Sequence, residues 1–197
     1  MNSAIETSGI KVLGISGSLR KGSYNTALLR AAQQLVPEGV EIEIFDLKGI
    51  PLYDGDLEAD GDPESVVELK DRIRQSDAVL FVTPEYNHGT SGVLKNAIDW
   101  ASRDRGEGSL WDKPVAMMGA GGMSGTSRAQ LQLQITLAET GAHVMSKPGV
   151  LVASAWGKFD SDGRLIDDDT RNIVKAHMDA LKAWISRHGV AESILVA

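Results

Sequence analysis

The chain has 197 residues, of which 42% are hydrophobic and 24% are charged, as is usual for one soluble globular domain. It carries 27 acidic side chains against 20 basic ones, and the net charge of −7 argues against a nucleic-acid-binding protein. It contains no cysteine, which excludes disulfides, thiolate metal sites and a cysteine nucleophile.

The start of the chain is polar, and we expect residues 1–9 to form a flexible tail rather than a signal peptide. No apolar run approaches the roughly 20 residues that are needed to cross a bilayer. We therefore expect a cytoplasmic protein that has no membrane partner.

Five apolar runs predict strands, and five helical patterns lie between and after them. The strands are expected at 10–15, 40–47, 78–83, 114–119 and 143–153. The helices are expected at 25–36, 63–75, 91–103, 126–140 and 168–187. This alternation predicts an α/β fold, namely one flavodoxin-like, doubly wound domain over 1–197. Its five parallel strands would take the order 2-1-3-4-5, with helices on both faces of the sheet.

The loop after the first strand is rich in small, hydroxyl-bearing and basic residues, and it leads directly into a helix pattern. Such a strand-loop-helix points free backbone N–H groups and the positive end of a helix dipole at one place, which suits a phosphate. The side chains that offer hydrogen bonds there are Ser16, Ser18, Arg20, Ser23, Asn25 and Thr26.

This loop differs from three well-known loop motifs at defining positions. A nucleotide-hydrolysing P-loop needs a lysine where the chain has Ser23. A dinucleotide-binding loop needs G-x-G-x-x-G, and Gly14, Gly17 and Gly22 lack that spacing. A hydrolase nucleophile elbow needs a glycine where Ser18 stands. The remaining alternatives are a phosphate site of another kind and an ordinary strand-to-helix turn.

The loop after the third strand reads PEYN at 84–87. In the predicted strand order, a ligand lies at the carboxyl ends of the first and third strands, so this loop would face the first one. Its proline is rigid, Tyr86 offers an aromatic surface, and Asn87 offers a donor and an acceptor, which together suit a flat heterocycle. In the alternative, Thr90 or Ser91 caps a helix and Tyr86 covers the core.

The loop after the fourth strand reads GAGGMSGTSRAQ at 119–130. Its glycines permit a close approach of the backbone to a ligand, or they form a turn before a helix that Ser124 or Thr126 caps. This loop would lie on the same edge of the sheet as the other two.

These residues resemble the NAD(P)H-dependent FMN reductases of flavodoxin-like fold, a group that includes quinone, azo-dye, chromate and ferric-chelate reductases. The resemblance rests on GSLRKGSYNTALL, on PEYNHGTSGVLKNAIDWAS and on the glycine-rich third loop, and it covers about residues 10–187. It implies FMN as cofactor, NADPH or NADH as electron donor, and a small-molecule electron acceptor. Members of this family commonly pair near the flavin, so a homodimer or homotetramer is expected.

The resemblance also implies roles for individual residues. The FMN phosphate would be held by Ser16, Ser18, Arg20, Ser23, Asn25 and Thr26. The ring would lie along Pro84, Glu85, Tyr86 and Asn87, and its pyrimidine edge would lie near Gly121 and Gly122. The segments 88–91 and 120–122 depart from the usual family pattern, which bears on the nicotinamide and acceptor sites. His88 would lie beside the ring or simply on the surface.

For the mechanism, the resemblance implies that a hydride passes from NAD(P)H to flavin N5 and then to the acceptor in ping-pong order. No side chain is required as an acid, a base or a nucleophile. Two alternatives are a flavodoxin-like electron carrier or redox-sensing partner, and a phosphate-binding regulatory domain without flavin.

The other chemistry-bearing residues do not form a motif. The four histidines are dispersed, and the acidic run at 160–169 lacks the glycine and glutamate positions of a calcium loop, so we expect no metal site. We expect Trp100 and Trp111 to be core or subunit-contact residues. The apolar segment Ile194 to Val196 gives mild support to oligomer formation.

Overall fold

The computed structural model describes residues 9–103 and 108–188. The expected tail at 1–9 and the apolar segment at 194–196 therefore lie outside the described residues, apart from Gly9. Within the described ranges, no helix is long and apolar enough to cross a membrane.

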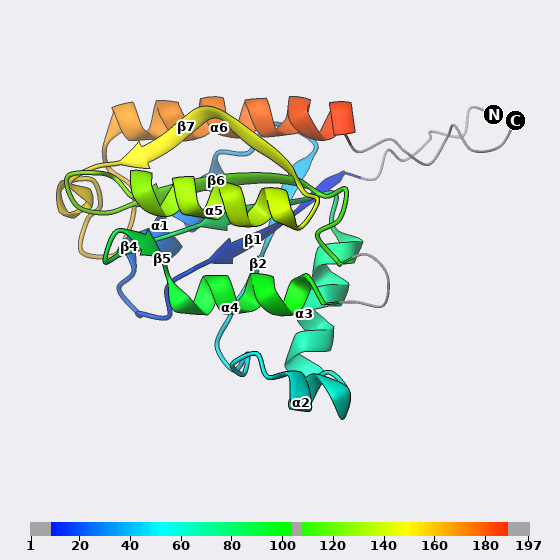
Figure 1. Cartoon of the computed structure of the whole chain (residues 1–197). Coiled ribbons are helices and arrows are strands. Elements are labelled where there is room, and N and C mark those ends of the chain that lie inside the picture. The colour runs from blue at the N-terminus through cyan, green and yellow to red at the C-terminus, as the bar shows by residue number, and fades with distance from the viewer. Residues whose placement is uncertain (1–8, 104–107, 189–197) are drawn as a thin grey trace, which may run out of the picture.

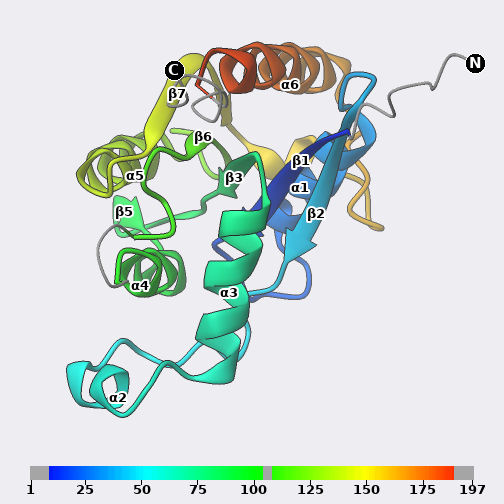
Figure 2. The same ribbon diagram turned by 90° about the vertical axis from the view of Figure 1, so that its right-hand side faces the viewer.

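Five parallel strands form the central sheet (Figures 1 and 2). They are β1 (Ile10–Ser16), β2 (Val40–Phe45), β3 (Ala78–Val82), β6 (Pro114–Ala120) and β7 (His143–Val152). Their spatial order is β2-β1-β3-β6-β7, which is 2-1-3-4-5 when these five strands are numbered along the chain. The predicted fold class and strand order are therefore confirmed.

The helices cover both faces of this sheet, as Figure 2 shows. On one face lie α1 (Tyr24–Gln34) and α6 (Asp168–His188). On the other face lie α3 (Glu64–Gln75), α4 (Gly92–Ala101) and α5 (Ser127–Glu139). The sequence did not predict three short elements: α2 (Gly55–Ala59), the hairpin formed by β4 (Glu85–Tyr86) and β5 (Gly89–Thr90), and the single 3-10 turn η1 (Ala155–Gly157).

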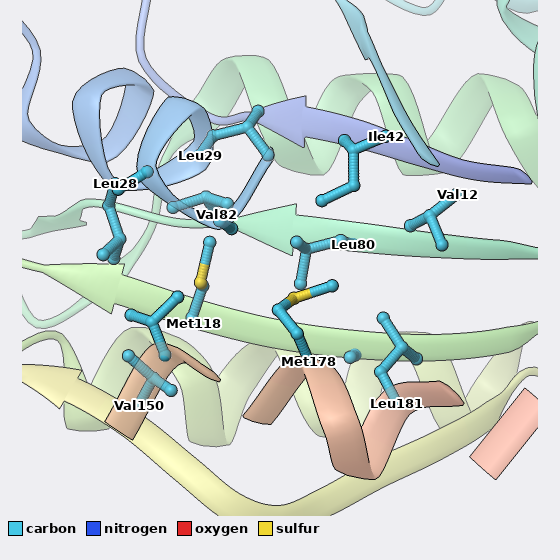
Figure 3. Packing of buried hydrophobic residues seen from close by; sticks show 14 of the residues in the cluster. Val12, Leu28, Leu29, Ile42, Leu80, Val82, Met118, Val150, Met178 and Leu181 are labelled. Carbon is cyan, nitrogen blue, oxygen red and sulfur yellow. The ribbon is translucent and has the colours of Figure 1, made fainter. Parts of the chain in front are cut away.

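Alternate residues of each strand point into two separate hydrophobic cores. In β3, Leu80 and Val82 belong to the core under α1 and α6, whereas Val79 and Phe81 belong to the core under the other three helices. Figure 3 shows the first core, where α1 and α6 pack on the strands through Leu28, Leu29, Met178 and Leu181. A strand that is buried on both faces has a continuous apolar sequence, which is why the apolar runs of the sequence predict the strands.

The register of the sheet brings the ends of three strands together. Ser16 at the end of β1 is opposite Val82, and Val82 is opposite Met118 of β6. The loops that follow β1, β3 and β6 therefore leave the sheet side by side, at the edge where ligands bind in folds of this kind.

Candidate functional site

These three loops and the segment after β7 surround a cavity of ≈ 320 Å³. Its lining consists of Ser18, Arg20, Ser23, Tyr24, Asn25, Pro84, Glu85, Tyr86, Ala120, Gly121, Gly122 and Trp156. The cavity is at the low end of the size range of small-molecule sites. Four residues that the sequence suggested do not line it: Ser16, Thr26, Asn87 and His88.

The first loop presents backbone donors at the N-terminus of α1. Ser23 caps this helix, because its hydroxyl accepts hydrogen bonds from the N–H groups of Asn25 (3.2 Å) and Thr26 (3.3 Å). The N–H groups of residues 18–22 and of Tyr24 have no acceptor among the described residues. Free N–H groups at the positive end of a helix dipole are the donors that an anion requires.

Arg20 adds a positive charge to these donors. Its guanidinium carbon lies 5.5 Å from the centre of the Tyr24 ring, which in turn stacks on Phe159 at 5.6 Å. No carboxylate within the described part of the chain forms an ion pair with Arg20. The side chain is exposed, so its charge is available to a ligand.

Three polar side chains near this loop form hydrogen bonds to other groups of the chain. The Asn25 amide donates to the carbonyl oxygen of Ala120 and accepts from the N–H of the same residue, both at 2.9 Å. Asn25 is buried, so this pair of bonds fastens the start of α1 to the end of β6. The hydroxyls of Ser16 and Thr26 hydrogen-bond to each other at 3.0 Å.

The second loop is a β-hairpin, and its tip is formed by Asn87 and His88. Both have positive φ angles, 51° and 64°, as the two-residue turn between paired strands requires. Tyr86 is 53% exposed, so it does not cover the core. Ser91 precedes α4, but its hydroxyl donates to the Gly17 carbonyl at 2.6 Å and does not cap the helix. The alternative of a capped helix start at this loop is therefore wrong.

The Glu85 carboxylate is bonded to the opposite wall of the site. It accepts hydrogen bonds from the Ser124 hydroxyl (3.0 Å) and from the N–H groups of Arg128 (2.9 Å) and Ala129 (3.3 Å). Burial raises the pKa of Glu85, but these hydrogen bonds outweigh burial and the pKa lies below its ordinary value. The carboxylate is therefore ionised and occupied by internal donors at neutral pH.

The third loop approaches the cavity with its backbone. The Gly121 N–H donates to the Val152 carbonyl at 3.0 Å, whereas the Gly122 N–H has no acceptor among the described residues. A Cβ atom on Gly122 would meet nothing within 4 Å, so the space beside this glycine is open. Neither Ser124 nor Thr126 caps α5 through its side chain, so the alternative of a locally capped helix is wrong here too.

Sequence reasoning missed two aromatic residues of the lining, Tyr24 and Trp156. Trp156 lies in η1, directly after β7, and is 61% exposed. Two hydrogen bonds hold this segment against the third loop, from Ser154 N–H to the Gly122 carbonyl and from Ala155 N–H to the Gly121 carbonyl, both at 3.0 Å. The signal in the sequence was a tryptophan that follows the fifth strand at the same edge of the sheet.

The remaining candidates lie away from the cavity. Asp160 accepts from the N–H groups of Asp162 (3.0 Å) and Arg164 (2.8 Å), so the acidic run forms a hydrogen-bonded turn before α6. Across the described ranges no group of three or more histidine, aspartate or glutamate side chains is arranged to hold a metal. Trp100 is buried and donates to the Pro51 carbonyl at 2.9 Å, whereas Trp111 is exposed.

Comparisons with known proteins point to one family. The sequence profile of the NADPH-dependent FMN reductases matches residues 10–157. Over 179 residues the chain is 51% identical to an NAD(P)H-dependent FMN reductase of Pseudomonas aeruginosa, with 90% of this chain and 96% of that protein covered. Over 181 residues it is 42% identical to an NAD(P)H:quinone oxidoreductase of Solanum tuberosum, with 88% and 92% covered.

A solved structure agrees with these relatives. FerB, a flavoenzyme NAD(P)H:(acceptor) oxidoreductase from Paracoccus denitrificans, matches with a TM-score of 0.84 at 39% identity, and the match covers 91% of this chain and 98% of that one. The cavity also has the groups that FMN requires, because free N–H donors and Arg20 suit a phosphate, and the open backbone at Gly122 and exposed aromatic rings suit a flat polar heterocycle. The chain therefore belongs to the NADPH-dependent FMN reductase family and is an oxidoreductase that uses FMN and NAD(P)H.

Proposed function

We propose that this chain passes a hydride from NAD(P)H to quinones or similar small electron acceptors by way of FMN held in the cavity. One observation carries the proposal: the unpaired donors of the first loop and the open, aromatic-lined backbone of the other loops surround the same cavity. The relatives from Solanum tuberosum and Paracoccus denitrificans support the acceptor class, because their names describe quinone and acceptor reduction.

The chain's own residues bind and orient in this proposal. The N–H groups of residues 18–22 and the Arg20 guanidinium hold the phosphate, and Tyr86 and the backbone at Gly122 border the ring. FMN, when bound, supplies the hydride-transfer chemistry. Glu85 is occupied by internal donors, so we assign no acid or base to the lining.

We further propose that electron donor and acceptor use one site in turn. The first loop, the second loop, the third loop and the segment after β7 all contribute to the walls of the cavity, so only its open side is left for a second ligand. The donor and the acceptor would therefore reach the same exposed side of the ring, and the oxidised nicotinamide must leave before the acceptor enters. Such an order is ping-pong.

Three measurements test the proposal. The purified protein should carry the absorbance of FMN and lose it when NADPH or NADH is added without oxygen. With a quinone as acceptor, initial-rate plots at several donor concentrations should be parallel. Flavin that NAD(P)H fails to reduce would indicate an electron carrier, a colourless protein that binds no FMN would refute the proposal, and intersecting lines would refute the shared site alone.

We also propose that the chain forms a homodimer or homotetramer. Leu131 and Ile135 lie one turn apart on α5 and are 62% and 67% exposed, and Leu151 of β7, which lines the same hollow as Leu131, is 49% exposed. Exposed apolar side chains that gather on one face are typical of an interaction surface. A second copy of the chain is the occupant that the family resemblance favours.

A further inference from the structure

The N-terminus of α5 is capped by a side chain from a different loop. Thr126, which precedes the helix, has a left-handed backbone with φ 71° and makes no side-chain capping bond. The Glu85 carboxylate instead accepts from the N–H groups of Arg128 and Ala129, the second and third residues of the helix. It thus satisfies two free donors and places a negative charge at the positive end of the helix dipole.

The same carboxylate also holds the third loop. It accepts from the Ser124 hydroxyl at 3.0 Å, and Ser124 lies two residues after Gly122 of the cavity lining. The Arg128 guanidinium lies 3.3 Å from the carboxylate and neutralises it. One side chain of the second loop therefore fixes both the third loop and the start of α5.

The other strand of the hairpin is held by α5 as well. The Thr90 N–H donates to the Gln132 side-chain oxygen, and the Thr90 hydroxyl donates to the Ala129 carbonyl, both at 3.0 Å. Figure 1 shows the β4–β5 hairpin beside the N-terminal end of α5. Removal of the Glu85 bonds would leave the hairpin attached through β5, so it should shift without detaching.

We propose that Glu85 is a positioning residue, which sets the spacing of the second and third loops around the flavin ring without contact between its carboxylate and the flavin. This inference rests on the proposed function. An alanine at position 85 has no acceptor oxygen, so the Ser124 hydroxyl and the two N–H groups of α5 would lose their partner and the two loops would separate. Glutamine is the conservative variant, because its amide oxygen can still accept from both N–H groups, which share the Oε2 atom, and the Ser124 hydroxyl can accept from its NH₂ group.

Two flavins test this role through binding rather than turnover. FMN and riboflavin share the ring, but only FMN carries the phosphate that the first loop would hold. The Glu85→Ala variant should raise the Kd of both flavins by about tenfold in fluorescence titrations, as expected when charge-assisted hydrogen bonds are lost. The ratio of the two Kd values should stay at its wild-type value. Glu139→Ala, at the exposed far end of α5, is the matched control and should leave both values unchanged.

Hydrogen exchange provides a readout that needs no flavin. In the Glu85→Ala protein, the amides of Arg128 and Ala129 should exchange faster than in the wild type, because they lose their acceptor. Unchanged exchange, or flavin Kd values within about threefold of wild type, would overturn the inference. A wild-type protein that binds neither flavin would instead refute the proposed function, and the exchange rates would still decide the role of Glu85.

A milder variant covers the case in which Glu85→Ala does not fold. Ser124→Ala removes only the bond between the carboxylate and the third loop and leaves both capping bonds of α5 in place. It should raise the Kd of both flavins by about threefold, less than Glu85→Ala, because the carboxylate keeps its bonds to Arg128 and Ala129. Unaltered Kd values in a folded Ser124→Ala protein would contradict the proposed role.

Discussion

Arg20 brings a positive charge to the cavity that no carboxylate of the described chain neutralises. A charge-assisted bond to phosphate contributes about 1.5–3 kcal/mol, so Arg20→Ala should raise the Kd of FMN by about 10- to 100-fold. The Kd of riboflavin should hardly change, because riboflavin has no phosphate. Arg30→Ala, an exposed position on α1, serves as the control. FMN that stays bound to Arg20→Ala through gel filtration at wild-type content would remove Arg20 from the phosphate site.

Asn25 acts on the cavity through its bonds to Ala120. Asn25→Ala would leave a buried N–H and a buried carbonyl of Ala120 without partners, at about 1–3 kcal/mol for each group. We expect urea denaturation to show a loss of about 2–4 kcal/mol and flavin binding to weaken at the same time. Asn96→Ala is the matched control, since Asn96 makes a similar pair of bonds to Tyr53 and Pro51 away from the cavity. Equal flavin affinity in both variants would argue against a role of Asn25 at the site.

For single residues, the sequence indicates which of them lie near the cavity but not which partners their side chains bind. Ser18, Arg20 and Tyr86 were expected around a ligand, and the structure places them in the lining. Asn25 and Glu85 were expected to bind the cofactor, yet their side chains bond to Ala120 and to the start of α5. Those partners are 95 and 43 positions away, so no local pattern could reveal them.

The sequence predicts a helix or a strand where its pattern of hydrophobic residues extends over many residues. Each of the five strands and five long helices was expected within a few residues of its observed bounds. The helix α2 spans only Gly55–Ala59 and has no buried residue, so it has no apolar period to read. The β4–β5 hairpin was missed for a similar reason, because two-residue strands carry no alternation and its turn uses Asn87 and His88 instead of a glycine.

The hairpin tip offers a test of its backbone conformation. A residue other than glycine in the left-handed region is strained by about 1–2 kcal/mol. A glycine removes this strain, but it also raises the conformational entropy of the unfolded chain, which cancels part of the gain in stability. His88→Gly should therefore raise the free energy of unfolding by about 0.5–1 kcal/mol in chemical denaturation. His88→Ala keeps the strain and should give no increase. Loss of flavin affinity in either variant would instead place His88 beside the ring.

For the whole molecule, stability should depend on pH through His177 of α6. Its Nδ1 atom lies 2.7 Å from the Pro148 carbonyl of β7, and its Nε2 atom is buried without a partner among the described residues. Burial lowers the pKa of His177, although the bond to Pro148 acts in the opposite direction. The unfolded chain, in which histidine has a pKa of about 6.5, therefore binds this proton more readily than the folded protein does.

The free energy of unfolding should accordingly fall as the pH drops below about 7 and rise again on return to neutral pH. Denaturation curves at several pH values check this. His177→Leu should make the free energy of unfolding depend less steeply on pH. Some dependence should remain, because burial and the charges of His143 and Arg187 also lower the pKa of His188. A slope that is the same in both proteins would show that other groups control the acid sensitivity.

The largest prediction concerns assembly, because α5 and β7 expose Leu131, Ile135 and Leu151 on one face. Light scattering after gel filtration should give two or four times the mass of 21.1 kDa. Ile135→Glu would place a charge in a buried contact, which is costly without a partner, so this variant should shift to the monomer. Leu52→Glu, at an exposed position before α2, should not shift. A wild-type monomer would refute the assembly, and an Ile135→Glu oligomer of unchanged mass would show that the chains meet through another face.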